Sequence, residues 1–137
     1  MHSILVKDFM DRNPHALPEQ ASVRDAVLFL CSEKIAGAPV VNSEGIVVGY
    51  VSEKDCLTQL LNDSFFCGTS PSVTSVMTIE VRSVTPETSI VDIAQTMVET
   101  APRNYPVIEN NRLVGTITRS CVLAALVKLN EACYAPK

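Results

Sequence analysis

One pattern is present twice in this chain, and its two copies run in register over most of the length. The apolar positions of a predicted helix at residues 23–31 recur 67 residues later, and beyond one deletion the spacing becomes 66. By the same shift, Pro39 corresponds to Pro106. Such regularity indicates two copies of one supersecondary unit. Asp55 is the exception, because its counterpart is Cys121. The two copies therefore predict a shared scaffold with unequal sites.

Length and composition limit what each copy can do alone. A domain of 137 residues buries about two thirds of the surface that its unfolded chain exposes. Apolar residues make up 47% of the chain and charged residues 19%, which is typical of globular proteins. Each copy holds roughly 65 residues, a size at which a hydrophobic core is marginal. We therefore expect the two copies to fold against each other.

Charge and hydropathy argue against several classes of protein. The net charge is −4 and the Lys and Arg residues are scattered, so a basic footprint for nucleic acid is absent. No apolar run approaches the ~20 residues that span a membrane. The N-terminus has no secretory-signal pattern, and its Met favours a chain that is not cut from a larger one. We expect no nucleic-acid partner and no membrane.

The cysteines indicate a reducing compartment and no metal site. Neither His2 nor His15 has ligand spacing to a pair of cysteines, so zinc is not expected. Cys31 and Cys56 lie on predicted apolar helix faces, where a reduced cysteine behaves as a small hydrophobe. Free thiols fit the cytoplasm best. The chain has five cysteines in no CxxC arrangement, namely Cys31, Cys56, Cys67, Cys121 and Cys133.

Apolar spacing predicts the same elements in both copies, a short helix followed by strand, helix, strand, strand and helix. In the first copy these elements are expected at residues 6–10, 15–17, 23–31, 38–41, 46–51 and after Ser52. In the second copy they are expected at residues 73–77, 82–84, 90–98, 105–108, 112–117 and after Thr118. Pro39 and Pro106 cannot donate to a strand ladder, so each is expected at a strand start or edge.

Small and polar residues predict the turns. Gly37 and its counterpart Asn104 both tolerate positive φ and are expected to reverse the chain after a helix. Gly45 and Asn111 also correspond, and each suits a left-handed position in a tight turn between strands.

Two serines predict helix starts. Ser22-x-x-Asp25 and Ser89-x-x-Asp92 have the spacing of capping boxes, in which each side chain bonds the other residue's backbone N–H. Apolar positions follow both pairs at helical spacing, so each pair is expected to open a helix.

The element before the last helix carries the clearest motif. It reads Gly-x-x-Ser-x-x-Asp at residues 49–55 and Gly-x-x-Thr-x-x-Cys at residues 115–121. Together with the Pro-Val-Val strand that ends at residue 41 and the duplicated βαββα order, these residues resemble the tandem CBS (cystathionine-β-synthase) domain family. The resemblance covers residues 4–129.

The resemblance implies an α+β fold in which two βαββα repeats pack through their sheets as a pseudo-two-fold pair. Repeat 1 is expected at residues 1–62 and repeat 2 at 73–130, with a linker at 63–72 and a C-terminal tail at 131–137. Clefts between such repeats hold adenosine-containing ligands, among them AMP, ADP, ATP and S-adenosylmethionine. The resemblance also implies a homodimer.

A binding site in the first copy follows from the resemblance. Asp55 is expected to bond the ribose hydroxyls, Ser52 to contact ribose or phosphate, and Lys54 to offer its charge to a phosphate. A helix N-terminus also favours anions. Gly49 is expected to let the ligand approach the backbone. The other expected members, which form a small apolar wall for a purine and the rim of the cleft, are Gly37, Ala38, Pro39, His15 and Ala16.

Two interpretations of Asp55 stay open at this point. Ser52-x-x-Asp55 is also a capping box, and the boxes at Ser22 and Ser89 imply no ligand. Losing a cap costs about 1 kcal/mol of stability. Losing a charge-assisted hydrogen bond costs about 1.5–3 kcal/mol of ligand affinity. One residue can perform both roles, and these magnitudes separate them.

The second copy is expected to hold a weaker or vacant site. Cys121 has a thiol, which is a poor hydrogen-bond acceptor, where the first copy has a carboxylate. Tyr105 either stacks on a base or fills the empty cleft itself. Cys121 serves either packing or redox sensing. The residues expected at this second site are Thr118, Arg119, Arg103, Tyr105 and Pro106.

These features predict a regulatory module that binds an adenosine-containing ligand and signals by conformational change to a separate, unknown protein. No His has a Ser or Cys partner in sequence context and no paired carboxylates flank a pocket, so catalysis is not expected. Neither a cofactor nor a metal is expected. The alternative is a structural dimerisation module whose ligand sites have decayed.

Overall fold

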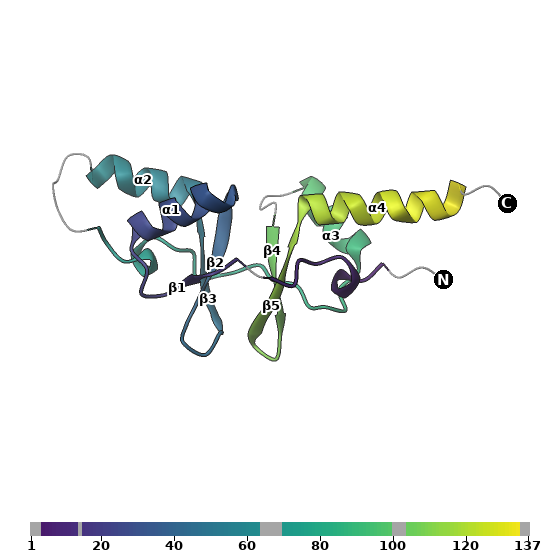
Figure 1. The fold of residues 1–137 in the computed structure, drawn as a ribbon, viewed down its shortest axis with the longest axis horizontal. Helices are drawn as coiled ribbons and strands as arrows, with labels where there is room; N and C mark the ends of the chain where they lie inside the picture. Colours follow the sequence, from purple (N-terminus) through teal and green to yellow (C-terminus); the bar gives the residue numbers. More distant parts are fainter. Residues whose placement is uncertain (1–3, 14, 64–69, 100–103, 135–137) are drawn as a thin grey trace. The chain divides into compact units, whose positions relative to one another are not determined.

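The computed structural model describes residues 4–13, 15–63, 70–99 and 104–134, and it forms two compact units (Figure 1). Unit 1 contains residues 1–14, 82–110 and 114–137, and unit 2 contains residues 15–81 and 111–113. The prediction of an α+β fold built twice from similar elements is confirmed. The bounds of the compact units differ from those of the sequence repeats, because each unit takes in a segment from the other repeat.

Unit 2 is built around a three-stranded sheet in the order β1-β2-β3. Strand β1 is parallel to β2, and β2 is antiparallel to β3. The helices α1 and α2 pack against each other. The elements of unit 2 are β1 (Leu17–Pro18), α1 (Val23–Glu33), β2 (Gly37–Val41), β3 (Val47–Ser52), α2 (Glu53–Asp63) and the 3-10 helix η2 (Val73–Ser75).

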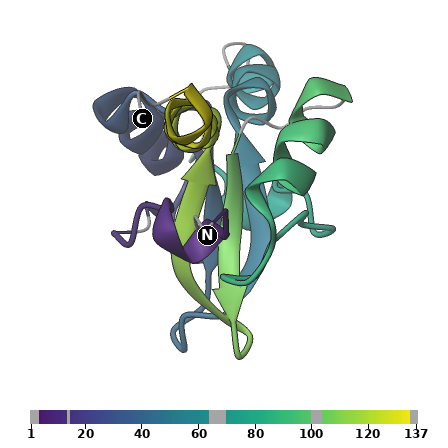
Figure 2. The same ribbon diagram turned by 90° about the vertical axis from the view of Figure 1, so that its right-hand side faces the viewer.

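Unit 1 has the same plan with a two-stranded sheet, β4-β5. Val84 adds a parallel bridge to Val107, in the place that β1 takes in unit 2. Helix α4 begins at the end of β5 opposite the β4–β5 turn, and α3 packs against it (Figure 2). The elements are the 3-10 helix η1 (Val6–Asp8), α3 (Ile90–Glu99), β4 (Asn104–Glu109), β5 (Arg112–Thr118) and α4 (Arg119–Tyr134). The first two residues of β5 are grouped with unit 2.

The short helices explain why the units and the repeats have different bounds. Val6, from the start of repeat 1, is fully buried in the core of unit 1. Its N–H donates to the carbonyl of Thr88 at 2.9 Å. Val73, from the start of repeat 2, is fully buried in the core of unit 2, and its N–H donates to the carbonyl of Ala21 at 2.8 Å. Each unit is thus completed by a segment that the chain supplies from outside the repeat.

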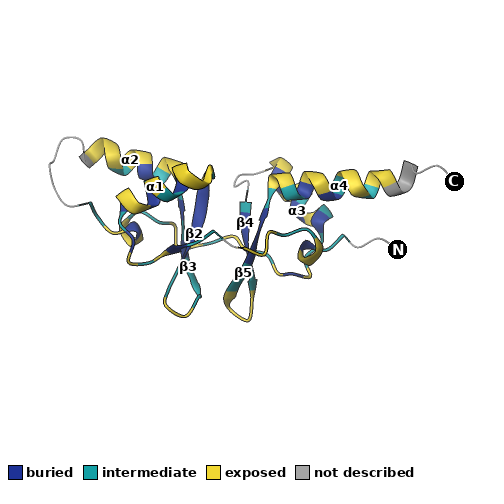
Figure 3. Cartoon of the chain, viewed as in Figure 1, coloured by how far each residue is buried: buried dark blue, intermediate teal, exposed yellow. Residues whose placement is uncertain are grey.

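The helix faces predicted from the sequence are largely confirmed by burial (Figure 3). Side chains at equivalent positions of α1 and α3 are buried in the two cores, as are those of β2 and β4. Cys31 does not follow this prediction, because it is exposed although α1 otherwise buries its apolar face. The equivalent buried pairs are Val23 and Ile90, Ala26 and Ile93, Leu30 and Met97, Val40 and Val107, Val51 and Ile117, and Cys56 and Val122.

The predicted turns are partly right. Gly45 and Asn111 have positive φ, 81° and 67°, as expected. Gly37 and Asn104 lie in strands instead, and the prediction that they reverse the chain is wrong. Helix α1 ends earlier, at Lys34, which adopts the left-handed conformation with φ 57° and donates its N–H to the carbonyl of Leu30.

Both prolines lie inside strands, so the expectation of a strand start is wrong, whereas the alternative of an edge position fits Pro39, where no ladder bond is lost. This residue pairs with Tyr50, whose backbone N–H and carbonyl bond Thr78 at 2.9 and 2.8 Å instead. On the other side of β2, strand β1 pairs with Val40 and Val41 and not with Pro39. The missing N–H therefore faces no ladder partner.

The helix caps differ between the two starts that the sequence predicted. Ser22 and Asp25 form the complete capping box, with two bonds of 3.0 Å. The hydrogen bonds from Ser22 lower the pKa of the Asp25 carboxyl. The hydroxyl of Ser89 accepts instead from the N–H of Val91 at 3.2 Å, one residue short of the position that Asp25 occupies in α1.

Candidate ligand site

The strongest candidate site is the start of α2 in unit 2. The N–H of Ser52 donates to Oδ2 of Asp55 at 3.0 Å, and the N–H of Asp55 donates to Oγ of Ser52 at 3.1 Å. Both side chains are half-buried. Within the described part of the chain, the other carboxylate oxygen of Asp55, Oδ1, has no hydrogen-bond partner. The capping interpretation is thus correct, and it leaves one carboxylate oxygen unused.

Strand β2 brings Gly37 to this helix start. Gly37 pairs with Ser52, the last residue of β3, and Pro39 pairs with Tyr50. Ala38 lies between them and points the other way, because side chains alternate along a strand. Its side chain is 1% exposed and belongs to the core of unit 2. Gly37 and Pro39 therefore share a face of the sheet that Ala38 does not.

Tyr50 is the residue of this site that the sequence analysis missed. A Cβ on Gly37 would lie 2.6 Å from Oη of Tyr50 and 2.7 Å from its Cε1, so the ring occupies the space that a side chain would take. Burial raises the pKa of Tyr50 to about 12. The register between β2 and β3, which sets Gly37 beside this ring, is the only signal that could have revealed it.

The Met77 side chain occupies the space beside the backbone of Gly49. A Cβ built on Gly49 would contact the Met77 side chain directly. The expectation that Gly49 lets a ligand approach the backbone is therefore wrong, because Met77 from the segment after η2 takes that space. Gly115 is its counterpart in unit 1, and there the backbone carbonyl of Asp11 lies 2.7 Å from the same built atom.

Of the residues expected at the rim, His15 has a structural partner of its own. Nδ1 of His15 lies 3.4 Å from Oε2 of Glu33, at the end of α1. Ala16 is half-buried next to β1. Lys54 is exposed in the first turn of α2, beside Asp55. Because Lys54 immediately precedes Asp55, its charge is available near the helix start.

Unit 1 repeats the helix start without the charge. The N–H of Cys121 donates to Oγ1 of Thr118 at 3.2 Å, and the Thr118 hydroxyl donates to Sγ of Cys121 at 3.1 Å. A thiol sulfur is a weak acceptor. Arg119 is exposed at the first position of α4, and Arg103 lies outside the described residues. Only the bond from the backbone N–H of the third helix residue is common to both units, because the second bond in unit 1 joins the two side chains and does not involve the backbone N–H of Thr118.

Tyr105 lies in the core of unit 1. It occupies the position of Ala38, and it is 3% exposed among residues of α3, α4 and β5. Its hydroxyl is buried and has no hydrogen-bond partner among the residues that the structure describes. Stacking on a base would require this ring to leave the core. Pro106, next along β4, is also fully buried.

The described residues contain neither a metal-binding cluster nor a membrane-spanning helix. No group of three or more His, Cys, Asp or Glu side chains there is placed to hold a metal ion. In that same part of the chain, no helix combines the length and apolar character needed to cross a bilayer.

Comparison with known proteins identifies the family. The model for the CBS domain matches residues 6–62 and 73–128. The chain therefore belongs to the CBS domain family, and its two matched segments make it a tandem pair.

Individual relatives share the fold over nearly all of this chain. An uncharacterized protein, MJ1225, from Methanocaldococcus jannaschii is 31% identical over 113 residues, which are 82% of this chain but 39% of that protein. A putative acetoin utilization protein (AcuB) from Vibrio cholerae has a TM-score of 0.85 and 27% identity, with 99% of both chains covered. CBSX2 of Arabidopsis thaliana, in complex with AMP, has a TM-score of 0.81 and 29% identity, covering 93% of this chain and 99% of that one.

Proposed function

We propose that this protein is a regulatory module that binds an adenosine-containing ligand, AMP in the first place, at the start of α2. The observation that carries the proposal is the unused Oδ1 of Asp55 at a helix N-terminus, within a Ser-x-x-Asp element. The crystal structure of the related CBSX2 in complex with AMP supports this choice of ligand. ADP, ATP and S-adenosylmethionine share the adenosine group and are the alternatives.

Different residues of unit 2 are proposed to bind the ribose, the phosphate and the purine of AMP. Oδ1 of Asp55 accepts a hydrogen bond from a ribose hydroxyl, which a carboxylate does strongly. The N-terminus of α2 and the ammonium group of Lys54 favour the negative phosphate. Gly37 and Pro39 are buried, so the half-buried Tyr50 ring on the same face is the aromatic surface that we propose for the purine. His15 and Ala16 are proposed to border the site.

Unit 1 is proposed to hold a weaker site. Thr118, Arg119 and Arg103 supply groups that suit a phosphate, but Cys121 supplies no charge for a ribose diol. Tyr105 and Pro106 are buried in the core. We expect one AMP to bind well at unit 2 and a second to bind poorly at unit 1.

Regulation follows if the ligand binds two conformations with different affinity, since only that difference can shift an equilibrium. We propose a change of conformation that another protein reads, with no catalysis by this chain. A cytoplasmic location and the absence of nucleic-acid and membrane partners belong to the same proposal.

A second function, dimerisation, is favoured by apolar side chains exposed on α2 and α4. Leu57 and Leu61 are each 60% exposed, Leu123 is 57% exposed and Val127 is 56% exposed. Large exposed apolar surfaces commonly mark interaction sites. We propose that the protein is a homodimer. If no adenosine compound binds, dimerisation alone becomes the better-supported function.

Isothermal titration calorimetry with AMP, ADP, ATP and S-adenosylmethionine tests the ligand proposal. We expect a Kd of about 1–100 μM for at least one compound, which corresponds to roughly 5.5–8 kcal/mol. Replacing Asp55 by Asn should weaken binding at least about tenfold, because a charge-assisted bond is lost. Thermal unfolding with excess ligand gives an independent reading, since a ligand at about 100 times its Kd stabilises by about 2.7 kcal/mol.

The chain supplies a matched control for this variant. Asp25 forms the same capping box with Ser22 at the start of α1. Asp25→Asn should lower stability as a lost cap does and leave AMP affinity at the wild-type value. If Asp55→Asn and Asp25→Asn behave alike in both measurements, capping is the only role of Asp55.

A further inference from the structure

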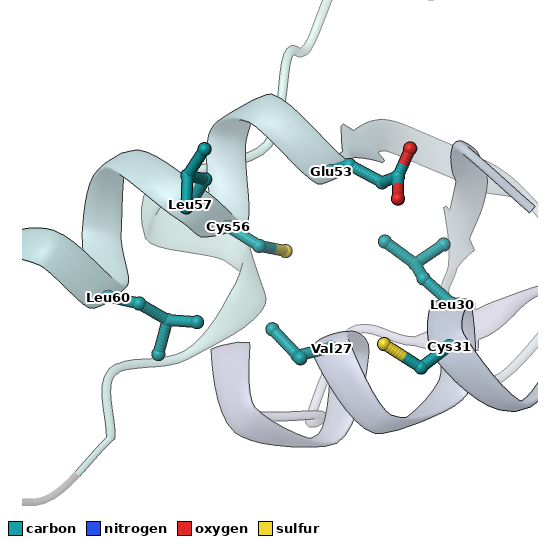
Figure 4. Close-up of a pocket in the computed structure, with 7 residues that line it drawn as sticks. All are labelled: Val27, Leu30, Cys31, Glu53, Cys56, Leu57 and Leu60. Carbon is teal, nitrogen blue, oxygen red and sulfur yellow. The ribbon is translucent and has the colours of Figure 1, made fainter.

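The pocket between α1 and α2 belongs to the apolar face that we propose for dimerisation. Its volume is about 220 Å³ (Figure 4). Leu57 lines the pocket and is also one of the exposed side chains of that face. A second copy that covers Leu57 also covers the pocket, so no separate ligand site is assigned there.

Two buried hydroxyls of unit 1 have no hydrogen-bond partner among the described residues, and they belong to Tyr105 and Thr116. An unpaired buried hydroxyl costs stability, so it calls for an explanation. Tyr105 lies in the core of unit 1, whereas Thr116, which is 8% exposed, precedes the core residue Ile117 on β5. Because side chains alternate along a strand, Thr116 faces away from Ile117 and shares its face with Thr118. The Thr116 hydroxyl therefore lies on the face that leads to the start of α4.

The start of α4 favours a negative charge. Its first turn contains Arg119 and no acidic residue, whereas the first turn of α2 contains Glu53 and Asp55. A helix N-terminus has N–H groups that the helix itself leaves unbonded, and its dipole attracts anions. At this point of unit 1, N–H and O–H donors thus occur without the carboxylate that unit 2 has. Such a set of donors suits an acceptor-rich anion.

Asp11 limits how strongly an anion can bind here. Its backbone N–H and carbonyl bond those of Thr116, each at 2.9 Å, so Thr116 has only its hydroxyl unpaired. The Asp11 side chain accepts from the N–H of Asn13 at 2.9 Å, which holds it in the turn after η1. Its negative charge opposes an anion bound nearby, so we expect modest affinity.

Thr116 and the helix start are spaced for one tetrahedral oxyanion. Positions two residues apart on a strand are separated by about 6.6 Å. One hydrogen bond of about 2.8 Å at each end leaves room between them for a phosphate group. A ribose diol is bound best by a charged acceptor, which Cys121 does not provide.

Building on the proposed function, in which unit 1 is the weaker site, we propose that the start of α4 binds a phosphate group without the ribose diol. The Thr116 hydroxyl donates to a phosphate oxygen, and the helix N-terminus supplies the positive potential. The phosphate is free or is an ester of any sugar. Unit 2 thus selects its ligand by the ribose diol, and unit 1 selects by the phosphate.

Nuclear magnetic resonance titration of the full chain with inorganic phosphate and with 2′,3′-dideoxy-AMP is the test. Phosphate should give saturable shifts at residues 118–121 with a Kd on the order of 1 mM. Dideoxy-AMP, which lacks the ribose diol, should bind at these residues as tightly as AMP does. At residues 52–55 of unit 2, the loss of the diol should weaken binding at least about tenfold, because the bond to Asp55 is lost.

The results at the two helix starts are read separately. If phosphate gives no saturable shift at residues 118–121, or if AMP binds there more tightly than dideoxy-AMP, the proposal for unit 1 is wrong. If AMP gives no shift at residues 52–55 while phosphate binds at residues 118–121, the AMP site proposed in unit 2 is wrong and the phosphate site stands.

Thr116→Val removes the hydroxyl and keeps about the same shape. It should weaken phosphate binding at unit 1 about tenfold, because a hydrogen bond to a charged group is lost. It should also raise the urea midpoint of the ligand-free protein, because an unpaired buried group is removed. Tyr105→Phe is the matched control, since it removes the other unpaired hydroxyl and should raise the midpoint without changing phosphate affinity. Equal phosphate affinity in Thr116→Val and wild type contradicts the proposal.

Ser120→Asp tests the helix start itself, because it places a carboxylate in the first turn of α4. It should weaken phosphate binding by repulsion and yet stabilise the helix, since an acidic residue is favourable at a helix N-terminus. Unchanged or tighter phosphate binding would overturn the place of the helix start in the site. Circular dichroism of each variant checks that it is folded.

Discussion

Units 1 and 2 begin their last helices with one hydrogen bond in common and one that differs. In both, a backbone N–H at the third helix position donates to a hydroxyl, from Asp55 to Ser52 and from Cys121 to Thr118. The second bond runs from the backbone N–H of Ser52 to the Asp55 carboxylate in unit 2, but from the Thr118 hydroxyl to the Cys121 thiol in unit 1. A helix therefore begins in both units, although only unit 2 has a carboxylate that accepts from the backbone. The charge of that carboxylate is the feature that we propose for binding a ribose diol.

Restoring the carboxylate in unit 1 should have the largest effect on function. We expect Cys121→Asp to tighten the weaker AMP site by about tenfold or more, because a charge-assisted bond contributes about 1.5–3 kcal/mol. Calorimetric stoichiometry should then approach two AMP per chain. Ser120→Asp adds the same charge one residue earlier and should leave the stoichiometry at one. An unchanged isotherm for Cys121→Asp would show that the lost charge does not explain the weaker site.

Gly37 tests whether unit 2 depends on its tyrosine. Gly37→Ala sets a methyl group within 2.6 Å of the Tyr50 hydroxyl, so we expect the free energy of unfolding to fall by about 1–3 kcal/mol in urea titrations. Asn104 occupies this position in unit 1, where Thr116 replaces the ring. In a Tyr50→Leu background the cost of Gly37→Ala should be smaller. The same cost in both backgrounds would mean that the ring is not the obstacle.

Tyr105 tests the core of unit 1, where a buried tyrosine takes the place that Ala38 has in unit 2. Its buried hydroxyl has no hydrogen-bond partner in the described part of the chain, so Tyr105→Phe should raise the free energy of unfolding by about 1 kcal/mol. Tyr50→Phe is the matched change in unit 2 and should not be stabilising to that extent, since Tyr50 is only half-buried. Loss of stability in Tyr105→Phe would reveal a partner for the hydroxyl.

The smallest expected effect is the deprotonation of Tyr50 in unit 2 at a higher pH than is usual for tyrosine. Tyr50 has its pKa raised to about 12 by burial, while the ordinary value is 10.0. Folding therefore favours the protonated phenol, so this contribution to stability is complete below pH 10 and disappears as the pH rises toward 12. Absorbance at the phenolate band should show a late step that is missing in Tyr50→Phe. An identical titration in wild type and variant would contradict this pKa.

Features set by neighbours in sequence could be predicted well. The Ser22–Asp25 and Ser52–Asp55 boxes span three residues, and the left-handed turns at Gly45 and Asn111 depend on single residues. The apolar spacing of α1 and α3 also predicted most of their buried faces. These predictions succeeded because the interactions that decide them close within one turn of chain.

Features set by distant contacts could not be predicted. Gly37 resembled a turn residue until the pairing of β2 with β3 set it against Tyr50. Gly49 was predicted to let a ligand approach the backbone, but the Met77 side chain fills the space beside it. Tyr105 was expected either to stack on a base or to fill an empty cleft, but its place on β4 turns it into the core of unit 1.

The sequence by itself determined the duplication, the order of elements, the helix caps at Ser22 and Ser52, and the single missing carboxylate. Tertiary structure alone decided that each unit borrows its short helix from the other repeat, with Val6 buried in unit 1 and Val73 in unit 2. It also decided which glycines are covered and where a pocket opens between α1 and α2. The physical reason is that local hydrogen bonds are specified by spacing along the chain, whereas burial depends on which distant surface is available to pack against.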